Sequence, residues 1–232
     1  SKYIREKDII CEVGPGSGLF SGLIHSKKNT VNILIDIPSV LLTSISLLFT
    51  LFPKKKFILP NEISDYDDFK NYDFIFLTPN QIDLIPDNYV DLGINTQSFQ
   101  EMEKHEIRNY LIFFNRVIGN NKHFFTSNRV KKVNNFFSYP WSEFKHFKKI
   151  YLQLCEYHKN KKTGSNNFNL ILQKNNKIQY KFLNLRFFER NFSLRFLKKF
   201  EKIYWIKEFI LFFFRKLPFY AKIKNIIKNR LQ

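Results

Sequence analysis

Apolar residues recur along residues 8–173 with two different spacings, which predict strands that alternate with helices. Short apolar runs are typical of strands buried in a parallel sheet, and they occur at residues 8–11, 31–37, 72–79, 90–96 and 122–127, with a shorter candidate at 57–59. Apolar residues with helical spacing lie between these runs, at residues 17–28, 38–52 and 103–118. Residues 149–157 and 167–173 instead alternate and are joined by a polar link with Gly164, which predicts a β-hairpin.

This order of elements predicts an α/β fold, a Rossmann-like doubly wound sheet that is mostly parallel and ends in a C-terminal antiparallel hairpin. The pattern then changes, so the sequence predicts a domain at residues 1–178 and a basic, aromatic-rich helical tail at residues 179–232. The tail holds fourteen Lys and Arg against three Glu, and its apolar residues follow helical spacing at Phe196, Phe200, Ile203 and Ile210. Such a basic amphipathic segment suits an anionic membrane surface, or it packs on the domain or on a second subunit.

The net charge of +18 suggests a polyanionic partner, which could be nucleic acid, an anionic membrane or an anionic glycan. The abundance of Lys, Asn, Ile and Phe is also what an AT-biased genome encodes, so the charge alone leaves both explanations open. Cys11 and Cys155 are too few for a disulfide framework or a metal cage, which favours a reducing cytoplasm. No stretch reaches the roughly 18 apolar residues of a membrane-spanning helix. The first strand follows Ser1 almost at once, so we expect the C-terminal portion of something longer.

Three glycines follow the first predicted strand directly and precede a predicted helix. Gly14, Gly16 and Gly18 have the spacing G-x-G-x-G, which matches neither the dinucleotide fingerprint nor the P-loop. Glycines at such a turn let the backbone approach a ligand closely, and the helix N-terminus offers free N–H groups. The sequence therefore predicts a nucleotide-binding turn; the alternative is a tight turn between strand and helix that binds no ligand.

An acidic residue ends the second predicted strand, where Asp36 lies 22 residues beyond Gly14. A carboxylate in this place suits a nucleotide ribose, because its two oxygens can accept hydrogen bonds from two adjacent hydroxyls. Asp36 is therefore a candidate for binding ribose. The alternative is that Asp36 caps the helix that follows it or is a turn residue.

The run from Glu12 to Gly18, Glu-Val-Gly-x-Gly-x-Gly, resembles the first motif of class I S-adenosylmethionine-dependent methyltransferases. Residues 77–102, with the distinctive run Ile-Asn-Thr-x-Ser-Phe-x-Glu-Met, resemble the sugar O-methyltransferase family, as do residues 124–129. The resemblance covers residues 8–175. It departs from the family at the front, where the helices that usually precede the first strand are absent.

The resemblance implies S-adenosylmethionine as the cofactor and assigns its parts to the predicted turns. In this family the glycine turn lies against the methionine part, with the acidic residue beneath it, and the loop after the third strand meets the adenine ring. The residues implied for the cofactor are Glu12, Gly14, Pro15, Gly16, Gly18, Asp36, Ile37, Asn80, Gln81 and Asn95.

The segment after the fourth strand is expected to meet the methyl acceptor, because ligands bind at the carboxyl edge of a parallel sheet. Asn95 is not followed by the Pro-Pro-aromatic run of methyltransferases that modify amino groups, which argues against N-methylation of a nucleic-acid base. The candidates for binding the acceptor are Gln97, Ser98, Asn128, Arg129 and Trp141. Trp141 offers a stacking face to a sugar ring, or it belongs to an aromatic core.

A sugar hydroxyl is a poor nucleophile at neutral pH, so a general base is expected beside it. Glu101 and His105, one helical turn apart, are the catalytic candidates. The alternatives are that Glu101 caps the following helix and that His105 is simply solvated. No spacing of His, Cys or acidic residues predicts a metal site.

The sequence thus predicts an enzyme of class EC 2.1.1, an S-adenosylmethionine-dependent O-methyltransferase that acts on a saccharide in the biosynthesis of surface glycans or glycoconjugates. The expected location is the cytoplasm, with peripheral contact at the inner membrane face through the basic tail. Two other hypotheses stay open. One is an RNA methyltransferase, which the net charge suits, and the other is a non-catalytic methyltransferase-like domain that docks on a membrane or a glycosyltransferase.

Overall fold

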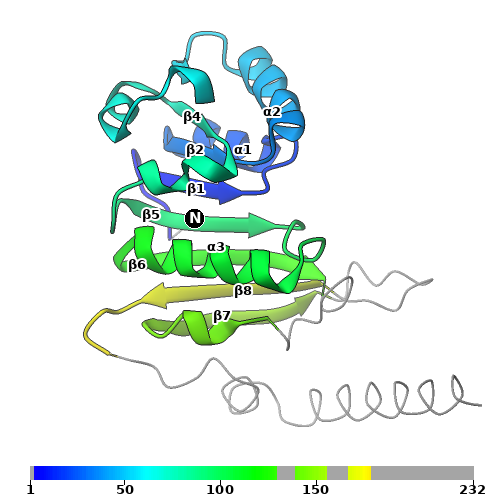
Figure 1. The fold of residues 1–232 in the computed structure, drawn as a ribbon, viewed down its shortest axis with the longest axis vertical. Coiled ribbons are helices and arrows are strands. Elements are labelled where there is room, and N and C mark those ends of the chain that lie inside the picture. Colours follow the sequence, from blue (N-terminus) through cyan, green and yellow to red (C-terminus); the bar gives the residue numbers. More distant parts are fainter. Residues whose placement is uncertain (1–2, 130–138, 156–166, 179–232) are drawn as a thin grey trace, which may run out of the picture. The chain divides into compact units, whose positions relative to one another are not determined.

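The computed structural model describes residues 3–129, 139–155 and 167–178, which form one eight-stranded sheet with helices on both of its faces (Figure 1). The strand order is β3-β4-β2-β1-β5-β6-β8-β7. The strands are β1 Ile9–Val13, β2 Val31–Ile35, β3 Phe57–Ile58, β4 Phe74–Leu77, β5 Val90–Thr96, β6 Ile118–Arg129, β7 Phe147–Cys155 and β8 Asn167–Lys174. The predicted α/β sheet with a C-terminal antiparallel hairpin is confirmed.

The helices fall close to the predicted segments. They are α1 Leu19–Lys28, α2 Pro38–Leu51 and α3 Lys104–Val117, with 3-10 helices η1 Pro60–Glu62, η2 Tyr66–Asn71, η3 Pro79–Leu84 and η5 Trp141–Glu143. Pro38 is the first residue of α2, a position where its fixed φ and missing N–H cost nothing. The first helix begins at Leu19, two residues later than predicted, because Gly18 still has a positive φ of 73°.

The two faces of the sheet carry different helices. Ile10, Ile94 and Ile24 of α1 pack together on one face, and α2 covers Leu34 and Phe76 on the same face. On the other face Phe114 of α3 packs on Phe124 of β6, with ring centroids 4.8 Å apart. Figure 1 shows α3 lying along β5 and β6. Burial on both faces explains why the parallel strands are continuous apolar runs.

The antiparallel end of the sheet is assembled out of chain order. β8 pairs with β6 through Phe124 and Leu172 on one side, and with β7 through Leu152 and Leu170 on the other. The last described strand therefore lies inside the sheet, and β7 forms the edge.

Two predicted features lie outside the described residues: the basic tail at 179–232 and the link between the last two strands. Residues 130–138 lie outside them as well. In the part of the chain that the structure describes, none of the helices combines the length and apolar character needed to cross a bilayer.

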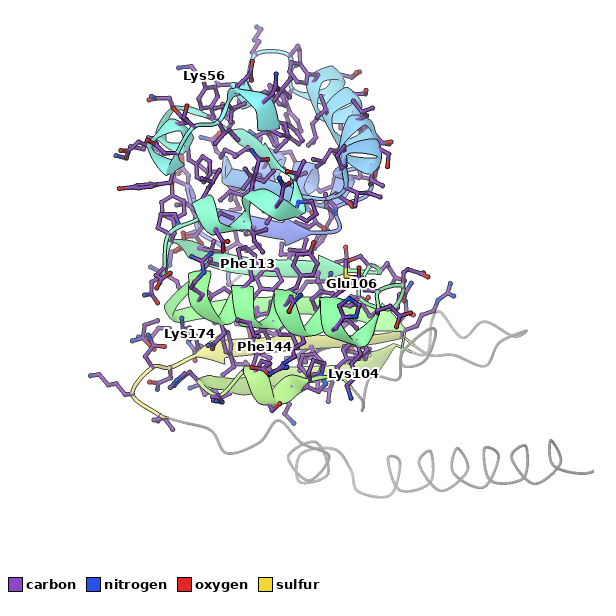
Figure 2. All side chains as sticks on the ribbon, viewed as in Figure 1. Lys56, Lys104, Glu106, Phe113, Phe144 and Lys174 are labelled. Atoms are coloured by element: carbon purple, nitrogen blue, oxygen red, sulfur yellow. The ribbon has the colours of Figure 1, made fainter. Side chains whose placement is uncertain are left out.

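A buried lysine joins the last strand to the end of α3. Lys174 of β8 is only 4% exposed, and its Nζ donates to the carbonyl oxygens of Asn115 and Ile118 at 2.7 and 2.6 Å. It also donates to Asn88 Oδ1 at 3.2 Å. Figure 2 shows Lys174 near the end of α3 that lies away from Lys104. The ammonium group thus satisfies carbonyl oxygens that the end of a helix leaves without partners.

We expect Lys174→Met to lower the free energy of unfolding by about 2 kcal/mol, because two carbonyl oxygens would lose the charged donor that Lys174 provides. Urea unfolding followed by circular dichroism measures this change. Lys177→Met, an exposed lysine three residues further on, is the matched control and should shift stability by less than about 0.5 kcal/mol. Equal effects of the two substitutions would show that the buried contacts contribute nothing.

Candidate functional site

The predicted donor residues follow the carboxyl ends of neighbouring strands. β1 lies between β2 and β5 and is parallel to both, with Val13 opposite Ile35 and Glu12 opposite Ile94. The chain leaves β1 for β2 on one side and reaches β5 on the other, so the strand order reverses at β1. Such a reversal opens a crevice at the carboxyl edge of an α/β sheet, where ligands of this architecture bind.

The three glycines form the turn between β1 and α1, each with a positive φ, of 70°, 58° and 73° for Gly14, Gly16 and Gly18. They differ in what surrounds them. A Cβ on Gly14 would lie 2.2 Å from Ser98 Oγ, and one on Gly18 would lie 3.0 Å from Leu48 Cδ1. A Cβ on Gly16 would meet nothing within 4 Å. The turn is therefore packed at both ends and open in its middle.

Asp36 lies beside the open part of the turn, directly after β2. The backbone N–H of Gly16 donates to Asp36 Oδ2 at a long 3.4 Å, and the N–H of Ile37 donates to Oδ1 at 2.8 Å. Asp36 is half-buried, and burial raises the pKa of its carboxyl above the ordinary value. Asp36 does not cap α2, because the N-cap residue of this helix is Ile37, which makes no side-chain hydrogen bond. The alternative that Asp36 is a turn residue stays open.

Glu12 lies beneath the turn and is completely buried. Ser21 Oγ donates to its Oε2 at 2.6 Å, and Thr96 Oγ1 donates to its Oε1 at 3.1 Å. Burial raises the pKa of Glu12 to about 7, and the two hydroxyl groups offset only part of that rise. The carboxyl group therefore ties α1 and β5 to the end of β1.

A buried amide pair joins the ends of β1, β5 and β6. Asn95 Nδ2 donates to the carbonyl of Val13 at 3.0 Å and to Ser98 Oγ. Asn128 Nδ2 donates to Asn95 Oδ1 at 2.8 Å, and Asn128 Oδ1 accepts from the N–H of Gln100 at 3.2 Å. Both side chains are fully buried. Asn95 and Asn128 were predicted to touch cofactor and acceptor, but the structure places them under the site, where their amides bond to the protein.

The segment of residues 97–101 lies above this amide pair. Gln97 has a positive φ of 60°, and its N–H donates to the carbonyl of Ser127 at 2.8 Å. Gln100 is buried and its Oε1 accepts from the N–H of Arg129 at 2.8 Å. The side chains of Gln97 and Glu101 are exposed. The fixed segment therefore presents an amide and a carboxylate outward at the carboxyl edge.

The two catalytic candidates lie at the start of α3. Glu101 precedes the helix, and its Oε1 accepts from Gln100 Nε2 at 3.2 Å. The cap of α3 is Glu103, whose N–H donates to Glu106 Oε2 at 2.7 Å, so Glu101 does not have the capping role. His105 is exposed in the first turn. Figure 2 shows Lys104 and Glu106 at this end of α3, the end toward which the β5 arrow points.

The loop after β4 carries the two candidates for adenine. Asn80 is exposed and its Oδ1 accepts a hydrogen bond from Thr78 Oγ1. Gln81 is engaged at both ends, since its Oε1 accepts from the N–H of Thr78 at 3.0 Å and its Nε2 donates to the carbonyl of Pro60 at 2.8 Å. Gln81 therefore shapes this loop, and Asn80 is the side chain that faces outward.

Four further candidates occupy contrasting surroundings. Trp141 is only 3% exposed and packs beside Tyr139 and Phe144, so the predicted stacking face is wrong and the aromatic-core alternative holds. Pro15 is buried in the glycine turn, whereas Ile37 is exposed beside Asp36. Arg129 is half-buried at the end of β6.

Sequence patterns gave no sign of several residues that support the site. Ser21 and Thr96 hold Glu12, and Ser44 Oγ donates to the carbonyl of Gly16 at 2.6 Å. Burial raises the pKa of Tyr110 in α3 to about 12, and the negative charge of Asp36 adds to this rise. Serines inside helices carry no motif, so only the packing of α1, α2 and α3 on the sheet identifies these partners. Among the described residues, no three His, Cys, Asp or Glu lie together as metal ligands would.

No family model and no curated protein matches the sequence of this chain, whereas solved structures match its fold. An S-adenosylmethionine-dependent methyltransferase from Methanosarcina mazei has a TM-score of 0.53 at 16% identity, over 75% of this chain and 95% of that chain. Geranyl diphosphate C-methyltransferase from Streptomyces coelicolor has a TM-score of 0.54 at 8% identity, over 73% and 74%. The [4+2]-cyclase SpnF has a TM-score of 0.52 at 9% identity, over 74% and 76%.

The described chain therefore has the α/β fold of class I S-adenosylmethionine-dependent methyltransferases, as the sequence predicts. At these identities the likeness is one of fold. The similar proteins carry out reactions as different as C-methylation of geranyl diphosphate and a [4+2] cyclisation, so the reaction must be argued from the residues at the sheet edge. The resemblance to sugar O-methyltransferases stays a prediction.

Gly14→Ala should destabilise the protein more than Gly16→Ala does. Both alanines would have a positive φ, which costs about 1 kcal/mol, but only the Cβ at position 14 would overlap Ser98, which adds about 1–3 kcal/mol. Urea unfolding of both variants measures the difference. In a Ser98→Gly background the excess cost at position 14 should shrink; an unchanged excess would mean that Ser98 does not set it.

Glu12→Gln should change how stability depends on pH. The folded pKa of Glu12, about 7, lies above the ordinary 4.5, so the folded state holds a proton that the unfolded state has released. Wild-type stability should therefore fall as the pH rises from about 4.5 to 7, by on the order of 3 kcal/mol, and then level off. Urea unfolding at several pH values should show this fall flattened in Glu12→Gln and retained in the exposed control Glu6→Gln. A fall of equal size in both variants would contradict the assignment.

Proposed function

We propose that this chain is an S-adenosylmethionine-dependent O-methyltransferase whose acceptor is a saccharide hydroxyl. The observation that carries the proposal is the meeting of the open glycine turn, Asp36 and the buried Glu12 at the carboxyl ends of β1 and β2. These three features lie at one edge of the sheet, beside the exposed residues of the segment 97–101.

The residues present suit an adenosyl sulfonium compound. Gly16 leaves room where a Cβ would otherwise project, so a ligand can reach the backbone of the turn. Within the described part of the chain, Asp36 Oδ2 makes only a long 3.4 Å contact, and this oxygen can accept a hydrogen bond from a ribose hydroxyl. Asn80 presents an exposed amide after β4, at the place expected for adenine. Bound there, S-adenosylmethionine supplies a methyl group that is electrophilic because it is attached to a sulfonium.

The protein side of the transfer is positioning and proton removal. Gly16 and Asp36 bind the methyl donor. The segment 97–101, held from below by the Asn95 and Asn128 amides, orients the acceptor. Fixing both partners in line supplies much of the acceleration of such a displacement. The acceptor hydroxyl must lose its proton, and Glu101 is the carboxylate on this segment that can accept it, with His105 as the neighbouring alternative.

A polar acceptor fits the outward side chains. Gln97 and Glu101 offer hydrogen-bonding groups, as a polyhydroxy compound requires. The run Asn95-Thr96-Gln97-Ser98 lacks the pattern of enzymes that methylate base amino groups. RNA remains the second candidate because of the net charge of +18.

The test of the donor site is calorimetric titration of the full chain with S-adenosylhomocysteine. Asp36→Ala should bind about 10- to 100-fold more weakly, because the ribose would lose charged hydrogen bonds. Asp83→Ala removes an exposed aspartate of η3 and should bind as the wild type does. No binding by the wild-type chain would favour the non-catalytic alternative.

The test of the acceptor is transfer of a labelled methyl group to fractionated cell glycans, with RNA and protein fractions alongside. Label in glycans, lost in Glu101→Gln with donor affinity unchanged, is the expected result. Label that enters only RNA or protein would overturn the saccharide assignment and leave the donor site standing.

A further inference from the structure

The helix α2 differs from an ordinary surface helix, because residues 37–53 contain no Asp, Glu, Lys, Arg or His. The whole chain is 25% charged, so a charge-free run of this length on the surface is unusual. A helix at the surface of a soluble domain normally carries charged residues on its outer side. The outer side of α2 therefore calls for a physical explanation.

The exposed residues of α2 are apolar or bear a hydroxyl group. Leu42 is 66% exposed, and Phe49 and Leu51 are also exposed. Leu42, Ile45 and Phe49 follow one another along one flank at helical spacing, and the Phe49 ring stacks on Phe57 with centroids 4.0 Å apart. Ser39, Thr43, Ser46 and Thr50 are exposed between the flanks. We call the exposed residues of α2 the uncharged face.

Lysines gather at one end of this face. Lys54 and Lys56 follow α2, and Lys27 and Lys28 end the neighbouring α1. Lys55 joins the two groups, since its Nζ donates to Asn29 Oδ1, directly after α1, and pairs with Asp73 at 3.3 Å. Figure 2 places Lys56 beside the loop that follows α2.

We propose that the uncharged face and these lysines dock on an anionic membrane surface. Leu42 and Phe49 on one flank and Leu51 on the other would enter the boundary between headgroups and acyl chains, and the lysines would contact anionic headgroups. Charge complementarity favours this occupant, because a second copy that met this face with its own α2 would bring the same lysines and no acidic residue on that helix. The proposal is independent of the methyl-transfer function.

The docking leaves the candidate site accessible. Helices α1 and α2 both begin at the carboxyl edge of the sheet, after β1 and β2, and end at the opposite edge where the lysines lie. The headgroup contacts are therefore made at the edge away from Gly16 and Asp36. The site faces along the membrane or away from it.

The test is flotation of the full chain with phosphatidylcholine vesicles, with and without phosphatidylglycerol. Lys54→Glu/Lys56→Glu should lower the partition coefficient on anionic vesicles at least about thirtyfold, since each lysine near such a surface contributes about 1 kcal/mol. Leu42→Ser/Leu51→Ser should lower it about tenfold. Lys104→Glu/Lys177→Glu makes the same change of charge elsewhere on the described surface and should stay within about twofold of the wild type.

Circular dichroism checks that each variant is folded. The substituted lysines and leucines are all exposed, so the substitutions should leave the core intact. A wild-type chain that does not float, or equal losses in the two lysine pairs, would overturn the proposal. So would sedimentation velocity showing a dimer that Leu42→Ser/Leu51→Ser dissociates, because the uncharged face would then be an interface between copies.

Discussion

The arrangement of the candidate site depends on the hydrogen bonds of one buried amide. Asn95 reaches across the carboxyl ends of three strands, bonding to Val13 of β1 through its nitrogen and to Asn128 of β6 through its oxygen. Ser98 completes the contact by resting on Gly14. The turn that would hold the donor and the segment that would meet the acceptor are therefore parts of one polar network. A network of this kind rigidifies a site only while every member is satisfied, and here each amide group has a partner.

Two carboxyl groups at the same edge show how environment separates roles. Glu12 is buried under the turn, where its hydrogen bonds to Ser21 and Thr96 join α1 and β5, and burial raises its pKa. Asp36 is half-buried, with one oxygen used by its own neighbour Ile37 and the other only weakly engaged. A sealed carboxyl suits support, whereas a partly solvated one can exchange water for ligand hydroxyls at small cost.

The sequence was sufficient to predict the order of strands and helices, the hairpin, and the positions of the glycine turn and Asp36 after the first two strands, because apolar periodicity and the position of a strand end are local properties. It was insufficient for the roles of Asn95, Asn128 and Trp141. A polar residue after a strand looks the same in sequence whether it faces a ligand or a neighbouring strand, and an aromatic after proline looks the same whether exposed or buried. Those distinctions depend on which strands become neighbours. The pairing of β6 with β8 cannot be predicted from the sequence of either strand alone.

The insertion of β8 between β6 and β7 has a consequence for how the chain is made. When the ribosome has delivered β7, the strand that must separate it from β6 does not yet exist, so β6 presents an open edge and β7 has no neighbour. The sheet can close only when residues 167–174 have been made, and with them Lys174, whose ammonium group bonds to carbonyl oxygens at the end of α3. During that interval the nascent chain displays the kind of unpaired strand edge that invites pairing with other chains.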